Sequence, residues 1–289
     1  MASGRLVDFQ AHDDGVNAWQ TARVAPPSEL AHQIYGYSDY WERTGGFSTR
    51  RELPHAEGVL IVNLDAPIAI TGGDGRVLRL QAGEAFVAGA HLRPALSQSD
   101  GAQAGIHVFL PLATLRRLLG LPMHRLVDQV VPLDALLGTE ALALGRALCE
   151  AKDLATRVAL LDAALVRRLR QAPTLGRQQA QALELLRMRP DQDIAEIARE
   201  IGWSRKHLAD RVQDAVGVGP RSFRRLLRFQ DLTARIGRHA GPPDWAGLAL
   251  DAGYCDQSHM IREFREFSGL TPELYRARSL PDGGGLVEG

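Results

Sequence analysis

The C-terminal third of the chain contains an internal duplication. Residues 194–203 match residues 245–254, and after a one-residue insertion the match continues downstream. Each copy has two apolar residues at i, i+3 spacing, then an alanine, a glycine and an aromatic residue. The pattern predicts a short helix that ends in a sharp turn, because glycine tolerates positive φ. The matched pairs are Ile194 with Trp245, Ile197 with Leu248, Ala198 with Ala249, Gly202 with Gly253, and Trp203 with Tyr254.

A second predicted helix follows the turn in each copy. Ser204 and Asp256 are suitable N-cap residues for these helices. Each helix has one narrow apolar seam and an otherwise polar surface, which is the pattern of a helix-turn-helix unit whose second helix enters the major groove. A plain helical bundle with a duplicated hairpin is the alternative. Two units in register, each followed by Gly-x-x-Pro, favour DNA binding. The seams are Leu208, Val212 and Ala215 in the first copy and Met260, Phe264 and Phe267 in the second.

Residues 253–276 strongly resemble the C-terminal signature of the AraC/XylS family of transcription regulators. The first copy, with Leu208, Gly217, Pro220 and the pair Arg228-Phe229, resembles the first helix-turn-helix of that family. The resemblance covers about residues 177–278. It implies two units that enter successive major grooves on one face of the DNA.

Two positions depart from the family pattern. Val212 stands where an aromatic residue is common, and Phe223 where tyrosine is common. Both substitutions keep an apolar side chain, so the implied fold is unaffected. The resemblance also implies a long connecting helix, here about Pro220–Arg238.

The outward residues of the two second helices are the predicted DNA contacts. Arg205 and Arg211 are suited to bidentate contact with guanine, and Gln257 to adenine, whereas Arg262 suits a base or a phosphate. Asp256 is interpreted as a cap, because phosphate would repel its carboxylate. The full predicted set is Ser204, Arg205, Lys206, His207, Arg211, Gln257, Ser258, His259, Arg262 and Arg265.

Four arginines of the connecting helix, and Arg276 beyond the second unit, have two interpretations. Each either contacts a backbone phosphate or pairs with a nearby acid such as Asp231. The four are Arg221, Arg224, Arg225 and Arg228.

The first 110 residues contain short apolar runs separated by glycine and proline. Such runs are typical of strands in a small barrel or sandwich. The segment Leu80–Gly89 weakly resembles a cupin strand-turn-strand. The predicted strands are Gly58–Leu64, Ile68–Ile70, Arg76–Leu80, Ala85–Ala88 and Ile106–Leu110. By resemblance, such an N-terminal domain binds an effector and supports dimerisation.

A helical period begins after Pro111 and predicts helices over about 134–150 and 152–171. The apolar stripe of the second helix fits packing against the N-terminal domain or dimerisation, and both remain open. Residues 171–176 contain proline and glycine and predict a linker.

The fold class is therefore α+β, with an N-terminal cupin-like small β-barrel with helices and a C-terminal all-α domain of two helix-turn-helix units joined by a long helix. The expected domains are residues 1–110 (β-rich effector domain), 111–175 (helical dimerisation or linker region), 176–279 (AraC-type DNA-binding domain) and 280–289 (flexible tail).

Other chemistry has little support in the sequence. His55, His91 and His107 lack His-x-His spacing, so no metal and no cofactor are expected. The aromatic residues before the first strands could line an apolar ligand pocket or simply pack in the core; they are Tyr35, Tyr37, Tyr40, Trp41 and Phe47.

The charge is unevenly divided although the chain is neutral overall. Residues 176–278 carry 17 basic and 14 acidic residues, a net +3, and the remainder carries net −3. Cys149 and Cys255 are far apart, which fits a reducing cytoplasm. No signal peptide or membrane span is expected.

The sequence thus predicts a cytoplasmic, sequence-specific transcription regulator with no enzymatic activity. Its expected partners are double-stranded DNA, a small-molecule effector, a second copy of the chain, and RNA polymerase if it activates. Two alternatives are a cupin-type enzyme fused to a DNA-binding tail and an architectural DNA binder that senses nothing.

Overall fold

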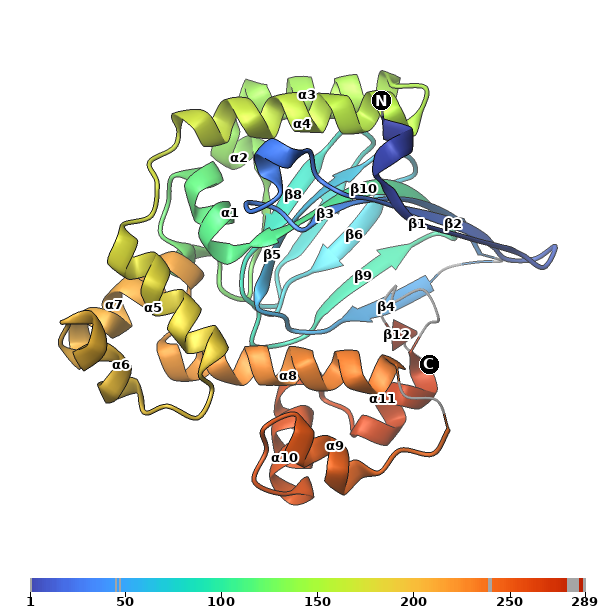
Figure 1. Cartoon of the computed structure of the whole chain (residues 1–289). Coiled ribbons are helices and arrows are strands. Elements are labelled where there is room, and N and C mark those ends of the chain that lie inside the picture. The colour runs from blue at the N-terminus through green and yellow to red at the C-terminus, as the bar shows by residue number, and fades with distance from the viewer. Residues whose placement is uncertain (1, 45, 47, 239–240, 280–285, 288–289) are drawn as a thin grey trace.

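The N-terminal half of the molecule consists mainly of two β-sheets (Figure 1). The computed structural model describes residues 2–44, 46, 48–238, 241–279 and 286–287. The larger sheet has seven strands in the order β1-β2-β3-β10-β5-β8-β11, and its neighbouring strands are antiparallel. These strands are β1 (Leu6–Asp13), β2 (Ala18–Val24), β3 (Gly36–Arg43), β5 (Glu57–Asn63), β8 (Ala85–Ala88), β10 (Ala102–Pro111) and β11 (Val130–Pro132).

The second sheet has five strands in the order β12-β4-β9-β6-β7. The chain crosses from this sheet to the larger one between β7 and β8, so the cupin-like segment Leu80–Gly89 joins two sheets. The strands are β4 (Ser48–Glu52), β6 (Ile68–Thr71), β7 (Val77–Leu80), β9 (Ala95–Ser99) and β12 (Leu286–Val287).

The two sheets face each other as the layers of a sandwich. Apolar side chains from both sheets form one buried cluster between them, which includes Val59, Ile70 and Phe86. The predicted closed barrel is not confirmed, because the strands form two separate open sheets.

The outer face of the larger sheet packs against helices. Val108 and Leu110 alternate with inward-facing residues along β10, so they point to the opposite side of the sheet. There they share a core with Leu115 and Leu161 from two of the covering helices. This half of the molecule also contains η1 (Ala2–Arg5), η2 (Ser28–Leu30), α1 (Leu112–Leu119), η3 (Met123–Leu126), α2 (Leu133–Leu137), α3 (Thr139–Glu150) and α4 (Leu154–Gln171).

Helix α4 is an integral part of the N-terminal half. Its Asp162 accepts hydrogen bonds from the Tyr37 hydroxyl (2.6 Å) and from Arg5 (2.7 Å). The apolar stripe of α4, with Leu161 and Leu165, is buried within the chain itself. The stripe therefore packs against the sheet, as one of its two sequence interpretations states.

The C-terminal region is helical, apart from β12. A long central helix, α8, lies between two pairs of shorter helices, and its bounds coincide with the predicted connecting helix. The elements are α5 (Arg177–Met188), α6 (Ile194–Ile201), α7 (Arg205–Val216), α8 (Pro220–Arg238), α9 (Trp245–Asp251), α10 (Gln257–Ser268) and α11 (Pro272–Arg278).

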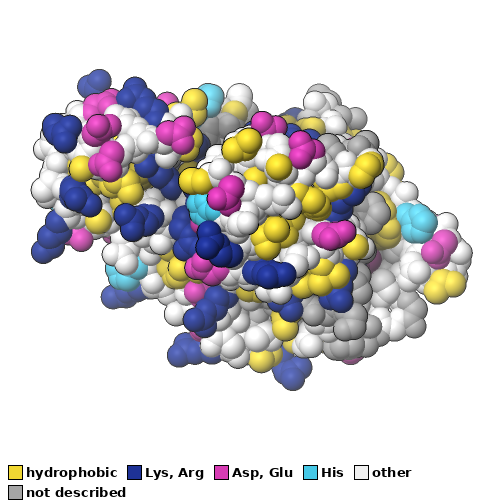
Figure 2. Space-filling view, turned by 90° about the horizontal axis from the view of Figure 1, so that it is seen from below, with side chains coloured by type: hydrophobic (Ala, Val, Ile, Leu, Met, Phe, Trp, Pro, Cys, Tyr) yellow, Lys and Arg dark blue, Asp and Glu magenta, His cyan; other side chains and the backbone are white. Residues whose placement is uncertain are grey.

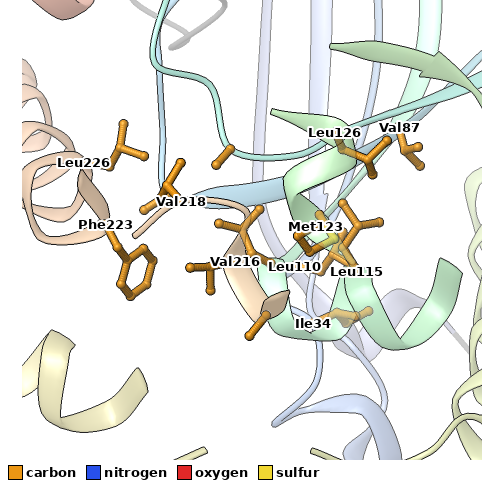
Figure 3. Close-up of a cluster of buried hydrophobic side chains, with 14 of the residues drawn as sticks. Ile34, Val87, Leu110, Leu115, Met123, Leu126, Val216, Val218, Phe223 and Leu226 are labelled. Atoms are coloured by element: carbon orange, nitrogen blue, oxygen red, sulfur yellow. The ribbon is translucent and has the colours of Figure 1, made fainter. Parts of the chain in front are cut away.

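The two halves of the molecule share a continuous apolar core. Figure 3 shows Met123 and Leu126 of η3 on the N-terminal side and Val216, Val218 and Phe223 on the C-terminal side of one cluster. A Cβ atom at Gly217 would lie 2.9 Å from Val127 Cγ2, so the turn after α7 lies against the segment that follows η3.

Polar contacts join the halves as well. Arg116 of α1 and Asp214 of α7 form an ion pair with an Nε–Oδ2 distance of 2.8 Å. Gln230 of α8 donates to Glu57 (2.6 Å) and accepts from the backbone N–H of Ala56 (3.2 Å). The helices that follow residue 176 are therefore seated directly on the sheet domain.

The expected tail, residues 280–289, lies mostly outside the described residues. Within it, Leu286 and Val287 pair with Arg51 and Arg50 and so extend the smaller sheet. Among the residues that the structure describes, no helix is long and apolar enough to cross a membrane.

Candidate nucleic-acid interface

The first helix pair is formed by α6 and α7. Asp193 caps α6 by accepting from the N–H of Ala195 (2.6 Å), and Gly202 ends the helix with φ of 79°. The side chain of Ser204 then accepts from the N–H of His207 (3.1 Å) and caps α7. The predicted glycine turn and serine cap are confirmed.

The second pair, α9 and α10, repeats these features. Asp244 caps α9, and Gly253 has the same φ of 79°. Asp256 accepts from the N–H of His259 (2.7 Å) and caps α10, as predicted. The repeated sequence pattern therefore encodes the same local geometry twice.

Both second helices bury a narrow apolar seam and expose their first turn and outer face. The predicted seam residues are all buried, so the opposite face of each helix is free to meet a partner. They are Leu208, Val212 and Ala215 in α7 and Met260, Phe264 and Phe267 in α10.

Six of the ten predicted contact residues are exposed and make no hydrogen bond or ion pair with any described residue. They occupy the first turn of α7 and the first turn and outer face of α10. Nothing in the described chain therefore competes with a partner for these side chains. The six are Arg205, Lys206, Gln257, Ser258, Arg262 and Arg265.

The other four predicted residues have contacts within the domain. Ser204 serves as a cap, and the rings of His207 and His259 lie edge-on to Trp203 (4.7 Å) and Tyr254 (5.3 Å). The half-buried Arg211 donates to Gln179 Oε1 (3.1 Å). These contacts hold the side chains in fixed positions beside the exposed residues.

The structure has a basic hollow beside α7 that was not predicted from the sequence. It has a volume of about 300 Å³ and lies where the first turn of α5 meets α7. Its lining brings Arg177 and its neighbours, which lie outside the repeat, next to residues of the first unit. The one sequence feature that could have pointed to this hollow is Gly176, which directly precedes the start of α5. The lining residues are Gly176, Arg177, Gln178, Gln179, Trp203, His207 and Arg211.

Most of the arginines on α8 make contacts within the protein. Arg225 and Arg228 both bind the buried carboxylate of Glu263, and Arg224 donates to the carbonyls of Gln192 and Arg189. These three arginines serve mainly to join α8 to its neighbours.

The remaining predicted charges near α8 differ among themselves. Arg221 is exposed and has no partner among the described residues. Arg276 donates to the carbonyl of Gly241 (2.5 Å), and Asp231 pairs with Arg235 rather than with the four named arginines.

Figure 2 shows the underside of the molecule, onto which α9–α11 project. Lys and Arg side chains are numerous at the left end, where Figure 1 places α5–α7, and in the centre. Asp and Glu side chains lie among them, so the face carries dispersed positive charge and not a uniform patch.

Three histidines of the sheet domain, His55, His91 and His107, are largely surrounded by protein, and His91 is the most buried of them. Burial lowers the pKa of both His55 and His107 to about 4, and it also lowers the pKa of His91. Electrostatic repulsion from His91 adds to the lowering of the His55 pKa. The described residues contain no group of three or more potential ligands that could hold a metal ion.

The five aromatic residues near β3 do not form one cluster. Tyr37 is buried toward α4, whereas Tyr35 and Trp41 are substantially exposed. Tyr40 points between the two sheets, and Phe47 lies outside the described residues. Of the four aromatic residues that the structure describes, Tyr40 is the candidate for lining a site between the sheets.

Comparison with known proteins identifies the helical region. A family model described as a helix-turn-helix domain matches residues 197–278. A predicted AraC-like transcription regulator of Streptomyces antibioticus is 35% identical over 89 residues, which is 30% of this chain and 28% of that protein. An uncharacterized HTH-type transcriptional regulator of Staphylococcus aureus (strain MSSA476) is 26% identical over 91 residues, or 32% of this chain and 12% of that protein.

Solved structures with a similar course of the chain include ToxT from Vibrio cholerae O395. It has a TM-score of 0.45 and 9% identity, with 80% of this chain and 96% of that chain covered. An AraC-type transcriptional regulator from Chromobacterium violaceum has a TM-score of 0.32 and 19% identity, with coverage of 35% and 90%.

Residues 197–278 therefore form a helix-turn-helix domain. Within that class, the AraC-like relative from Streptomyces antibioticus supports the resemblance to the AraC/XylS family that the sequence predicts. The chain spans about an eighth of the length of the Staphylococcus aureus relative and just over a quarter of the Streptomyces antibioticus relative.

Proposed function

We propose that the chain is a sequence-specific DNA-binding transcription regulator, controlled by a small molecule that binds in the N-terminal domain. The observation that carries the proposal is the matched exposure of α7 and α10. Each begins at a capped turn and presents unpartnered polar and basic side chains at its start, such as Arg205 and Gln257. N-terminal turns of this kind are the part of a recognition helix that reaches base edges.

In this proposal the pairs α6–α7 and α9–α10 are two helix-turn-helix units, and α8 sets their separation. The exposed Arg262 and Arg265 are suited to bases or phosphates, and the basic hollow lined by Arg177 and Arg211 is suited to a backbone phosphate. The two units would enter successive major grooves, so the recognised site would contain two elements about 10 base pairs apart.

The N-terminal domain is proposed to be a cupin-like sensor. The contacts of Arg116 with Asp214, and of Gln230 with Glu57, link this domain to helices α7 and α8. A ligand that changes the packing of the sandwich would act on the DNA-binding helices through these contacts between the two halves. The domain assignment, with residues 1–110 as sensor, 111–175 as a helical region and 176–279 as the DNA-binding domain, is part of the proposal.

The proposal is tested by selecting, from random duplex DNA, the sequences that the protein binds. The expected result is one enriched motif with two elements on one face of the helix. A pool that binds but shows no enriched motif would instead indicate an architectural DNA binder, because contacts to phosphate alone carry no sequence information.

A further inference from the structure

The facing surfaces of the two sheets have an apolar half and a polar half. The apolar half contains Val59, Ile70 and Phe86 from both sheets. On β3 and β10, however, the same inward face carries polar side chains. Paired residues of an antiparallel ladder share a face, and Ser38 pairs with His107, Tyr40 with Gly105, and Glu42 with Gln103. A sandwich that only needed a stable core would bury apolar residues there.

Tyr40 and His107 are neighbours without polar partners. Their rings lie edge to face with centroids 4.7 Å apart, and His107 makes a similar contact with Phe109 at 5.7 Å. Among the described residues, none hydrogen-bonds to the Tyr40 hydroxyl or to the His107 ring nitrogens. Neither group is fully enclosed by protein, because both residues retain part of their accessible surface.

Glycine at position 105 leaves room for the Tyr40 ring. A Cβ atom there would lie 2.9 Å from the Tyr40 hydroxyl oxygen, so Tyr40 rests against the bare backbone of β10. The tyrosine ring is therefore held flat on the sheet, and its hydroxyl stays in the interior. Polar groups in the interior that lack partners are costly unless water or a ligand satisfies them.

The charged groups of the polar half are already neutralised. Arg50 on β4 donates to Glu42 on β3, and Glu42 also accepts from Gln103 (2.7 Å). The hydroxyls of Ser48 and Ser99 lie 3.0 Å apart and bind each other. An ionic ligand would find no free counter-charge among these groups, and an unpaired charge in the interior costs several kcal/mol.

We propose that the space beside Tyr40 and His107 is the effector site, and that it takes a small, uncharged aromatic compound with a hydrogen-bonding group. The compound would continue the edge-to-face series of Tyr40, His107 and Phe109. Its polar group would bind the tyrosine hydroxyl and the imidazole. This inference rests on the proposed function, because it names the ligand class of the proposed sensor domain.

The ionisation of the two residues agrees with an uncharged ligand. Burial lowers the pKa of His107 to about 4, so at neutral pH its ring offers one donor and one acceptor. Burial also raises the pKa of Tyr40, which therefore keeps its proton and can donate. The negative charges of Glu42, Glu52 and Asp39 add to that shift, and Arg50 opposes it.

Three probes of similar shape test the ligand class: benzamide, benzoate and benzamidinium. Each is titrated into full-length protein, and binding is followed by saturation-transfer NMR and by the imidazole resonances of His107, assigned by their loss in His107→Phe. Benzamide is expected to bind in the millimolar range typical of so small a ligand and to shift these resonances. The two ions are expected to bind at least about tenfold more weakly.

Tyr40→Phe tests the position of the site, because it removes one hydroxyl and keeps the ring. Benzamide is expected to bind about fivefold more weakly to this variant, as for loss of one neutral hydrogen bond. Tyr35→Phe is the matched control, since Tyr35 is 48% exposed and lies outside the interior. Thermal unfolding of both variants shows whether each is folded.

Three outcomes would overturn the inference. If no probe binds, the interior is not a ligand site. Tighter binding of either ion would contradict the ligand class, and unchanged affinity in Tyr40→Phe and His107→Phe would place the site elsewhere. Failure of DNA selection with benzamide binding intact would count against the regulator function and leave the binding site standing.

Discussion

Glu263 in α10 accepts two hydrogen bonds from the same guanidinium nitrogen of Arg228 in α8, with Nη2–Oε distances of 2.9 Å to both carboxylate oxygens. The carboxylate is 4% exposed, and Arg225 of α8 binds it as well (2.7 Å). The guanidinium of Arg228 also lies 4.6 Å from the ring centroid of Tyr254. These contacts fix the orientation of the second proposed recognition helix on the long central helix.

The substitution Glu263→Ala should therefore reduce both stability and DNA affinity. We expect a loss of ~2 kcal/mol in the free energy of unfolding, because two arginines lose their buried partner but remain partly solvated. Urea denaturation followed by circular dichroism measures it. Glu266→Ala is the control: its side chain is 62% exposed and shares only Arg225, so a change below ~0.5 kcal/mol is expected. Equal losses in the two variants would contradict the assigned role of Glu263.

Gly253 should not tolerate a side chain. Its φ is 79°, and the nearest atom to an added Cβ, Arg228 Cδ, is 3.8 Å away, so Gly253→Val creates backbone strain and no clash. Valine in the left-handed region is expected to cost ~1–2 kcal/mol. Gly237→Ala in α8 has no positive φ and open space around it, and it should be neutral or stabilising. A Gly253→Val variant as stable as wild type in urea would rule out the turn.

Arg262→Ala should weaken specific binding by ~1–3 kcal/mol if the guanidinium reads a base, and the preference at one position of the site should relax. Arg146→Ala removes the same charge from an exposed position on α3 and should leave affinity nearly unchanged. Anisotropy titrations with the selected duplex and its single-base variants measure both effects. Equal affinity of Arg262→Ala and wild type would exclude Arg262 from the interface.

Stability should fall as the pH falls from about 6.5 toward 4. His55 and His107 have folded-state pKa values of about 4 because they are buried, whereas the unfolded chain binds protons near pH 6.5. Between pH 4 and 6.5 the unfolded state binds more protons than the folded state. The free energy of unfolding therefore rises with pH in this window, and the contribution of the two histidines is complete above pH 6.5. The slope should approach about 1.4 kcal/mol per pH unit for each histidine. Urea titrations at several pH values measure the slope, and His107→Phe should reduce it; a flat profile between pH 4 and 6.5 would contradict the burial of both rings.

The helical half of the fold was predictable because its signals are local. The caps at Ser204 and Asp256 and the turns at Gly202 and Gly253 lie within a few residues of the helices that they control. The bounds of α8 also followed from the resemblance, since the helix begins at Pro220, a residue suited to a first helical turn.

The sheet domain was less predictable because its contacts are distant in sequence. Seven strands were missed: polar residues hide the alternation in β1, β2, β3, β4 and β9, and β11 and β12 are only three and two residues long. The separation of the strands into two open sheets depends on the pairing of β10 with β3 and β5, which no local pattern encodes. The same holds for the neighbouring rings of Tyr40 and His107, which lie on different strands.

The sequence predicted which helix faces are exposed at the candidate DNA interface. It did not predict which side chains on those faces already have hydrogen-bond partners within the protein. The exposed face of α10 followed from its apolar seam, whereas the hydrogen bond of Arg211 to Gln179 required the packing of α5. The contribution of Arg177 to the basic hollow could not be predicted for the same reason.

The most direct test of the account is an anisotropy titration of full-length protein with its selected duplex, at two salt concentrations and with scrambled duplex as competitor. A sequence-specific regulator should remain bound to the selected duplex in the presence of the competitor. Its affinity should fall steeply as the salt concentration rises, because arginine and lysine contacts release counterions from DNA. Equal affinity for the selected and the scrambled duplex, or no binding to either, would contradict the proposed function.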